Sequence, residues 1–190
     1  LAECFPELTD EERDALRRRH FEAIGASVTE MSMAWFGSKK IIRDLIRVEG
    51  GEHLQAALEK GKGIILFSAH FTTFEFFFPV LEELCPTLCA MYRAQRNEMM
   101  NVMMTRGRRR AIDKLFQKDS VRDMVRSLAG NSVVWYAADQ SYRRKYSALV
   151  PFFGVPAMTN TATGRIAKMS KATVLTYFCR RLPDDSGYVL

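Results

Sequence analysis

The sequence predicts an α/β fold with a largely parallel central sheet flanked by helices. Short apolar runs, typical of buried strands, alternate with longer segments in which apolar residues recur at helical spacing. The first such run, residues 63–67, begins at a glycine and contains no charged side chain. Strands that are buried on both faces of a parallel sheet have this continuous apolar character.

Length and composition favour one globular domain over residues 1–190. Hydrophobic residues make up 47% and charged residues 26% of the chain, a balance that is not typical of disordered proteins. The chain has no initiator Met and ends inside an expected strand at residues 188–190. We therefore expect a fragment, incomplete at both ends. No run of about 18 uncharged apolar residues is present, so we expect no segment that spans a bilayer by itself.

The expected elements are helices and strands mixed along the chain. Thr9 and Glu12 form a capping-box pattern that starts a long helix, ended by Gly37. Its predicted buried stripe consists of Ile24, Val28, Met31 and Trp35. The later elements, in order, are a helix at 52–60, the strand at 63–67, a helix that contains Glu75 and is stopped by Pro86, a strand at 87–92, a helix capped by Asn97, a helix at 120–130, a strand at 132–138, a long loop at 141–158, a helix capped by Thr159 or Asn160 that reaches Ser170, and a strand at 173–179.

His70 follows the first strand, and Glu75 follows His70 by five positions. Reactive groups of open α/β sheets sit beyond the carboxyl ends of the strands. Histidine can exchange a proton near neutrality, and a carboxylate bonded to one ring nitrogen would fix its tautomer. Positions five apart on a regular helix point about 140° apart, so the pair meets only if His70 lies in the turn and Glu75 in the first helical turn, which Thr72 or Thr73 could cap. The alternative is a structural histidine and a surface glutamate.

Polar residues also follow the next two strands. Arg93 ends the strand at 87–92, and Asp139 and Gln140 follow the strand at 132–138. We expect these residues to share one rim of the sheet with His70. The aromatic segment at 76–78 either lines a pocket for an apolar chain or is ordinary core.

The net charge of +6 is unevenly distributed. Residues 91–126 hold ten basic and four acidic side chains, including Arg106, Arg108 and Arg110. Such a run is either a solvated basic face or a site for phosphates, acidic proteins or anionic lipids. Nucleic acid is the rival partner, but the chain has no aromatic RNA-binding motif and no zinc-finger spacing. Cys85 and Cys89 lack the two further ligands that a zinc site needs.

The sequence resembles the late acyltransferases of lipid A biosynthesis, most closely the lauroyltransferase type. The resemblance runs along essentially the whole chain and rests on segments whose order and spacing are specific. These are MAWF at 33–36, the strand with His-x4-Glu at 61–75, MYR at 91–93, TRGRRR at 105–110, ADQ at 138–140, PFFG at 151–154 and SGY at 186–188.

The resemblance implies transfer of an acyl chain from an acyl carrier protein thioester to a hydroxyl of a hydroxyacyl chain on the lipid A precursor. It implies His70 as general base with Glu75 in support, and neither a metal nor an organic cofactor. It also implies a membrane surface as partner, no nucleic acid, and a place on the cytoplasmic face of a bacterial inner membrane. We assign substrate binding to the remaining candidates, and for Asp139 the role stays open, with contact to an arginine as one option. These candidates are Arg93, Arg106, Arg108, Arg110, Asp139 and Gln140.

Two other functions are compatible with parts of the pattern. A glycerolipid acyltransferase would share the His-x4-acid element, although the DQ and PFFG segments favour the lipid A branch. A non-catalytic domain could instead use its basic face to bind membranes or nucleic acid.

Overall fold

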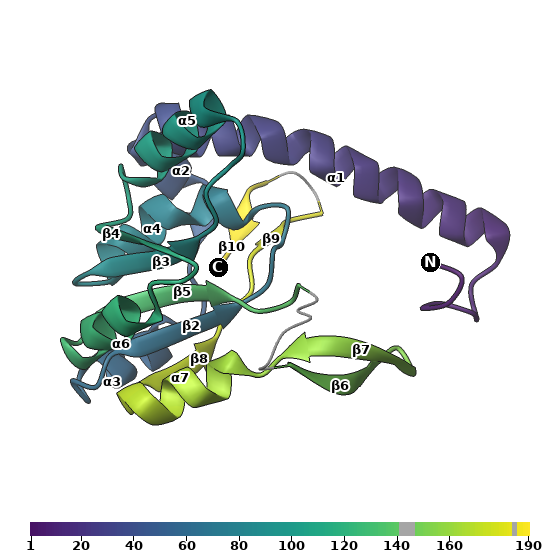
Figure 1. The fold of residues 1–190 in the computed structure, drawn as a ribbon. Helices are drawn as coiled ribbons and strands as arrows, with labels where there is room; N and C mark the ends of the chain where they lie inside the picture. Colours follow the sequence, from purple (N-terminus) through teal and green to yellow (C-terminus); the bar gives the residue numbers. More distant parts are fainter. Residues whose placement is uncertain (141–146, 184–185) are drawn as a thin grey trace.

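The computed structural model describes residues 1–140, 147–183 and 186–190 (Figure 1). Its centre is a five-stranded sheet in the order β4-β3-β5-β2-β8, and every pair of neighbouring strands is parallel. This confirms the α/β class and the largely parallel sheet. The strands are β2 (Ile64–Ser68), β3 (Leu88–Tyr92), β4 (Lys114–Gln117), β5 (Val133–Ala137) and β8 (Thr173–Thr176). β4 is the one strand of this sheet that the sequence did not predict.

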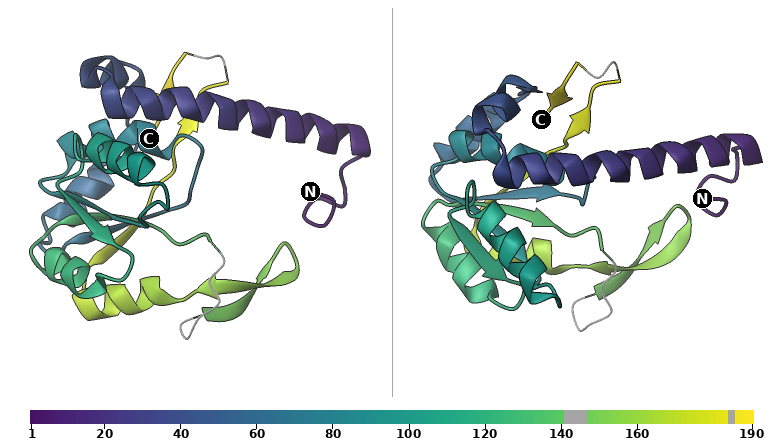
Figure 2. Two further views of the ribbon diagram at one scale, coloured as in Figure 1. Left: turned by 45° about the horizontal axis from the view of Figure 1, so that its top comes forward. Right: turned by 90° about the horizontal axis from the view of Figure 1, so that it is seen from above.

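Helices cover both faces of the sheet (Figure 2). Side chains alternate along β2, so that Ile64 and Leu66 pack on one face and Ile65 on the other. The first face is covered by α3 (Gly51–Leu58) and α4 (Phe78–Leu84), and the second by α6 (Val121–Ala129) and α7 (Ala162–Ser170). Burial on both faces explains why the β2 sequence is continuously apolar.

The long helix α1 (Asp10–Phe36) has the predicted capping box and ends at Gly37. Its predicted buried stripe is wrong in part, because Ile24 and Val28 are 40% and 56% exposed whereas Trp35 is buried. The N-terminal half of α1 extends away from the central sheet (Figure 2). In the part of the chain that the structure describes, no helix is long and apolar enough to cross a membrane.

Helix α5 (Glu98–Arg108) packs against the C-terminal end of α1. Its predicted cap is confirmed, since Asn97 Oδ1 accepts a hydrogen bond from the Met100 N–H at 3.1 Å. Gly107 meets Trp35 so closely that an added Cβ would lie 2.3 Å from the Trp35 Cγ atom. Glycine is therefore needed for the close approach of these two helices.

The chain after His70 differs from a simple helix. It begins with a 3-10 turn, η1 (Phe74–Phe77), and continues directly as α4. Thr73 precedes the turn but makes no capping hydrogen bond, and its hydroxyl instead donates to Cys179 Sγ at 3.3 Å. At the other predicted cap, α7 starts after Thr161, and Asn160 Oδ1 accepts from the Ala162 N–H at 2.8 Å.

The predicted loop at 141–158 is wrong over its described part, which forms a β-hairpin. Strands β6 (Ser147–Phe152) and β7 (Val155–Asn160) pair with each other and with no strand of the central sheet. Phe153 and Gly154 both have positive φ, as a two-residue hairpin turn requires. The prolines at 151 and 156 disfavour a strand prediction, which is why the sequence did not indicate this hairpin. The basic residues at 143–145 lie outside the described residues.

The remaining elements lie near the two chain ends. Helix α2 (Lys39–Asp44) leads to β1 (Ile46–Arg47), which pairs with β10 (Tyr188–Val189), and β10 pairs with β9 (Arg180–Arg181). The predicted strand at 173–179 is too long, because β8 ends at Thr176 and residues 177–179 connect it to β9 in the small second sheet.

Candidate active site

His70 and Asp139 meet at the carboxyl end of the central strands. The His70 Nδ1 atom lies 2.6 Å from Asp139 Oδ1, and the His70 backbone N–H donates to Asp139 Oδ2 at 2.9 Å. The strand register explains the contact, because Ser68 of β2 pairs with Ala137 of β5, two residues before each partner. The expected shared rim is confirmed for these two residues.

The contact fixes how His70 can exchange protons. When Asp139 accepts from Nδ1, the other ring nitrogen, Nε2, is left as the acceptor. The His70 side chain is 37% exposed, so the ring is reachable from solvent. The pair therefore has the geometry of a general base supported by a carboxylate.

Asp139 is held in its charged form. Partial burial raises the pKa of Asp139, but hydrogen bonds from the backbone and ring of His70, with the charge of that ring, outweigh it and lower the pKa below its ordinary value. A carboxylate whose pKa is lower in the folded state stabilises the fold above its unfolded pKa and loses that contribution as pH falls through the folded pKa.

We therefore expect Asp139→Asn to unfold at a lower temperature than the parent protein at neutral pH, because the asparagine lacks the stabilising charge. The difference should shrink as pH falls below the ordinary range of aspartate. Thermal unfolding followed by circular dichroism across an acid pH series measures it. A difference that persists unchanged to the lowest pH would contradict the stabilising role of the charge.

The expected hydrogen bond between Glu75 and His70 is not formed, because Glu75 binds other residues. Its carboxylate accepts from Trp35 Nε1–H at 3.1 Å and from Arg108 Nε–H at 2.8 Å, and Arg108 Nη2–H makes a second contact. The η1 turn carries Glu75 to the junction of α1 and α5, where it is 7% and Arg108 11% exposed. The carboxylate bound to His70 comes instead from β5, as Asp139.

One aromatic ring lies between the hydrogen-bonded pair His70–Asp139 and the ion pair Glu75–Arg108. Phe74 contacts the His70 ring edge to face at 5.8 Å and stacks on Trp135 at 5.1 Å. The guanidinium carbon of Arg108 lies 5.8 Å from the same Phe74 ring centre. Glu75 is thus connected to His70 only indirectly: Glu75 binds Arg108, Arg108 lies over the Phe74 ring, and Phe74 packs against the His70 ring.

The predicted anion-binding arginines fall into two groups. Arg93 and Arg106 are exposed, as are Arg110 and Gln140, but Arg110 belongs to the second group because, like Arg108, it binds other groups of the fold. Arg108 is paired with Glu75, and Arg110 donates to the backbone oxygens of Trp35 and Gly37 at 2.7 and 2.8 Å. Arg110 thereby binds carbonyls at the end of α1, a common role for arginine at helix C-termini.

A second buried charge network, which the sequence did not indicate, holds the turn after His70. Arg181 donates to both oxygens of Glu30, at 2.5 and 2.7 Å, and to Thr72 Oγ1 at 3.2 Å. The Tyr188 hydroxyl donates to Glu30 at 2.9 Å, and burial together with this bond raises the pKa of Tyr188 to about 12. These partners are 151 and 109 positions apart in sequence, so no local pattern could reveal them.

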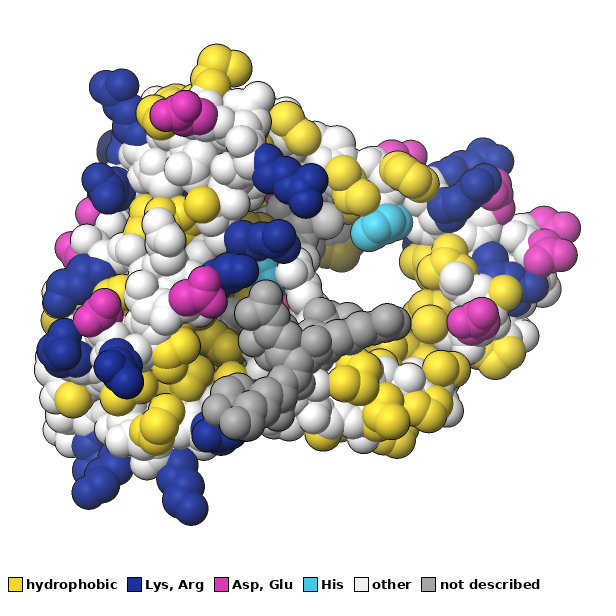
Figure 3. All heavy atoms as spheres, viewed as in Figure 1, with side chains coloured by type: hydrophobic (Ala, Val, Ile, Leu, Met, Phe, Trp, Pro, Cys, Tyr) yellow, Lys and Arg dark blue, Asp and Glu magenta, His cyan; other side chains and the backbone are white. Residues whose placement is uncertain are grey.

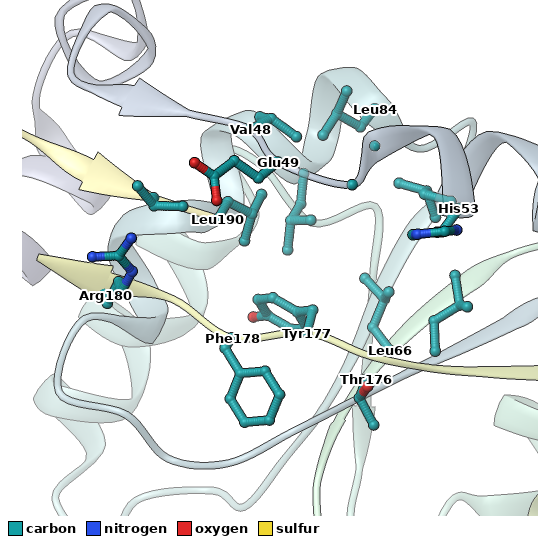
Figure 4. A pocket seen from close by; sticks show the side chains of 16 residues that line it. Val48, Glu49, His53, Leu66, Leu84, Thr176, Tyr177, Phe178, Arg180 and Leu190 are labelled. Carbon is teal, nitrogen blue, oxygen red and sulfur yellow. The ribbon is translucent and has the colours of Figure 1, made fainter.

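A pocket of about 350 Å³ opens beside the sheet, between β8 and α3 (Figure 4). Leu66, Leu175 and Tyr177 line it together with Leu81 and Leu84 of α4, while His70 and Asp139 do not. The three phenylalanines at 76–78 are fully buried and do not line it either. For this segment the structure supports the core alternative over the acyl-pocket alternative.

Comparison with known proteins identifies a family. The profile described as "Bacterial lipid A biosynthesis acyltransferase" matches residues 1–190. The chain is 34% identical over 188 residues to both the "Lipid A biosynthesis palmitoleoyltransferase" and the "Lipid A biosynthesis lauroyltransferase" of Escherichia coli (strain K12), covering 98% of this chain and 61% of each relative. A "Lipid A biosynthesis acyltransferase" of Haemophilus influenzae is 31% identical over 189 residues, covering 98% of this chain and 60% of that relative.

The chain spans about 60% of the length of these relatives. The equal identity to two transferases named for different acyl chains gives no preference for the lauroyl type. Because the profile match covers every residue, the chain belongs to the bacterial lipid A biosynthesis acyltransferase family.

Proposed function

We propose that the protein carrying this chain transfers a fatty acyl group from an acyl carrier protein thioester to a hydroxyl of a hydroxyacyl chain on the lipid A precursor. Family membership and the names of the relatives support the acyltransferase class and the lipid acceptor. The observation that carries the proposal is the hydrogen-bonded pair of His70 and Asp139 at the carboxyl end of the sheet.

In the proposed reaction, His70 Nε2 removes the acceptor hydroxyl proton as that oxygen attacks the thioester carbonyl carbon. Asp139 stabilises the imidazolium that forms. The tetrahedral intermediate then collapses, the carbon–sulfur bond breaks, and the leaving thiolate takes the proton back from His70. No covalent enzyme intermediate is needed, because a thiolate is a good leaving group. Asp139 takes the supporting role that the sequence alone assigned to Glu75.

Glu75 is proposed as a positioning residue. Its carboxylate neutralises Arg108 between α1 and α5, and Arg108 lies over the Phe74 ring that packs against His70. Loss of Glu75 would free a buried guanidinium beneath the active-site aromatic ring. Its effect on catalysis would therefore pass through the packing of Phe74.

Arg93 and Arg106 are proposed to attract the anionic substrates, the carrier protein and the phosphorylated lipid. Both are exposed, and Arg93 follows β3, the strand next to β5. Arg108 and Arg110 have partners within the fold, so we propose structural roles for them. Gln140 remains a candidate substrate contact because it is exposed beside Asp139.

Neutralising both exposed arginines, in Arg93→Gln/Arg106→Gln, should raise the apparent KM for the carrier protein or the lipid several-fold and change kcat less. Uniform binding lost from substrate and transition state has this signature. The effect should weaken with salt, since charges are screened over about 8 Å at physiological ionic strength. Steady-state kinetics at several salt concentrations, with each substrate varied in turn, measures it.

The matched control is Arg122→Gln/Lys168→Gln, which removes the same charge from exposed positions on α6 and α7. We expect this control to leave both KM values and their salt dependence unchanged. Equal behaviour of the two double variants would mean that Arg93 and Arg106 are only a solvated face.

The proposed site of action is the cytoplasmic face of the bacterial inner membrane, where the protein would contact the membrane surface and no nucleic acid. Transfer is tested by incubating the whole protein with acyl carrier protein thioester and purified acceptors, followed by mass spectrometry. Acylation of the lipid A precursor supports the proposal. Acylation of a glycerolipid alone would support the rival acyltransferase, and no acylation of any acceptor would support a non-catalytic domain.

A further inference from the structure

The β6–β7 hairpin exposes an unusually apolar surface. Residues 148–157 read ALVPFFGVPA, ten consecutive positions without a polar or charged side chain. Leu149, Phe152, Phe153 and Val155 are each at least half exposed, at 67%, 63%, 50% and 50%. Figure 3 shows these hydrophobic side chains gathered over the hairpin. Soluble surfaces rarely leave so many large apolar side chains together in water.

The hairpin is apolar on both of its faces. Cross-strand pairing places Phe152 opposite Val155, and Val150, two positions earlier, lies on the same face. Leu149 lies on the other face, with Pro151 and Pro156 paired opposite each other. Both views in Figure 2 show the hairpin extending away from the central sheet.

We infer that the β6–β7 hairpin inserts into the interfacial layer of a lipid bilayer. A hairpin that docks on a protein buries one face and leaves the other in water, so only one face needs to be apolar. Immersion in lipid removes both faces from water, which matches the exposure of Phe152 and Leu149 on opposite sides.

The dimensions and backbone chemistry also fit shallow insertion. Leu149 and Phe152 are three steps apart, a rise of about 10 Å. Membrane-surface elements bury their apolar parts about 5–10 Å into the boundary between headgroups and acyl chains. Full insertion would strand the unpaired hydrogen-bonding groups of the hairpin edges in hydrocarbon. Pro151 and Pro156 lack N–H groups, which lowers the number of such donors in the apolar part.

This inference extends the proposed function, whose acceptor is a lipid, but its test measures lipid binding and not transfer. A negative result in the lipid-binding test would therefore not contradict the proposed acyl transfer, and a negative result in the transfer assay would not contradict lipid binding. The surface also lies apart from the pocket beside β8, since the two share no residue.

The test is partition of the chain onto vesicles of phosphatidylethanolamine and phosphatidylglycerol, measured by flotation. One variant, Phe152→Thr/Val155→Thr, alters the first face, and Leu149→Thr alters the second. Threonine keeps strand propensity, and neither face contributes to the buried core, so thermal unfolding should not change. The control is Ile41→Thr on α2, where Ile41 is 55% exposed.

We expect Leu149→Thr to lower the partition coefficient about tenfold, because burial of one large apolar side chain has that effect. Phe152→Thr/Val155→Thr, which removes two such side chains, should lower it further, and the control should change it little. Loss from only one face would indicate a protein partner and overturn the inference. The inference would also be overturned if both variants kept the partition coefficient of the parent and salt released the protein completely from the vesicles, since binding would then be electrostatic. Self-association of the unmodified chain without vesicles, abolished by either variant, would instead assign the surface to a second copy.

Insertion depth gives an independent readout. Tryptophan placed in the hairpin by Phe152→Trp should be quenched by vesicles whose lipids carry brominated acyl chains, whereas Ile41→Trp should not. The native Trp35 and Trp135 are buried and supply a constant background. Equal quenching of the two reporters would overturn insertion of the hairpin.

Discussion

Replacing His70 by alanine is expected to lower kcat for acyl transfer by about 10²–10⁴-fold, the usual contribution of a general base. In the proposed reaction the His70 ring accepts the hydroxyl proton, and no other histidine lies in the described site. Association with membranes should be unchanged, because the exposed apolar surface is on a different element. Transfer is measured by mass spectrometry of the acylated acceptor at saturating substrate, and vesicle flotation of the same variant reports membrane association.

Asp139→Asn should lose a large part of the same activity, since asparagine cannot stabilise an imidazolium by charge. The double variant His70→Ala/Asp139→Asn should be little worse than His70→Ala alone, because the two residues act as a unit. Additive losses would show that Asp139 acts on the substrate and not through His70. A His70→Ala variant that retains more than about a tenth of the rate would contradict the assignment of the base.

Four of the five central strands, β2, β3, β5 and β8, were predictable from sequence. The apolar run of β2 is buried on both faces, so local composition identified it, and the position of His70 at its carboxyl end followed. The pairing of Ser68 with Ala137 is a long-range property of the sheet. Local pattern placed Asp139 on the same rim but could not tell that it, and not Glu75, would reach the ring.

The misassigned features share a physical cause. Glu75 binds Trp35 and Arg108, which are 40 and 33 positions away, so helix packing decides its partner. In α1, Ile24 and Val28 continue the apolar spacing of Met31 and Trp35 but are exposed, because apolar spacing alone does not determine what covers a helix face. The β6–β7 hairpin contains two prolines, which oppose a strand prediction even though they pair with each other.

Glu75→Ala is expected to lower the free energy of unfolding by roughly 3–5 kcal/mol, the cost of leaving one partner of a buried ion pair without compensation. The unpaired group would be the Arg108 guanidinium, whose side chain is 11% exposed. Chemical denaturation of the parent and the variant measures the difference. Glu82→Ala is the matched control, because it breaks the ion pair between Glu82 and Lys39. The side chains of this pair are more exposed, at 34% for Glu82 and 26% for Lys39. More exposed pairs of this kind contribute about 0–1 kcal/mol.

The paired variant Glu75→Leu/Arg108→Met separates the charge from the packing. It removes both charges and keeps apolar volume, so it should recover much of the stability that Glu75→Ala loses. If Glu75 only positions Phe74 through Arg108, this variant should also retain measurable transfer below its unfolding temperature, because Asp139 still holds His70. If transfer is lost as completely as in His70→Ala while the fold is stable, Glu75 would instead act on the reacting groups, as the His-x4-Glu spacing first indicated.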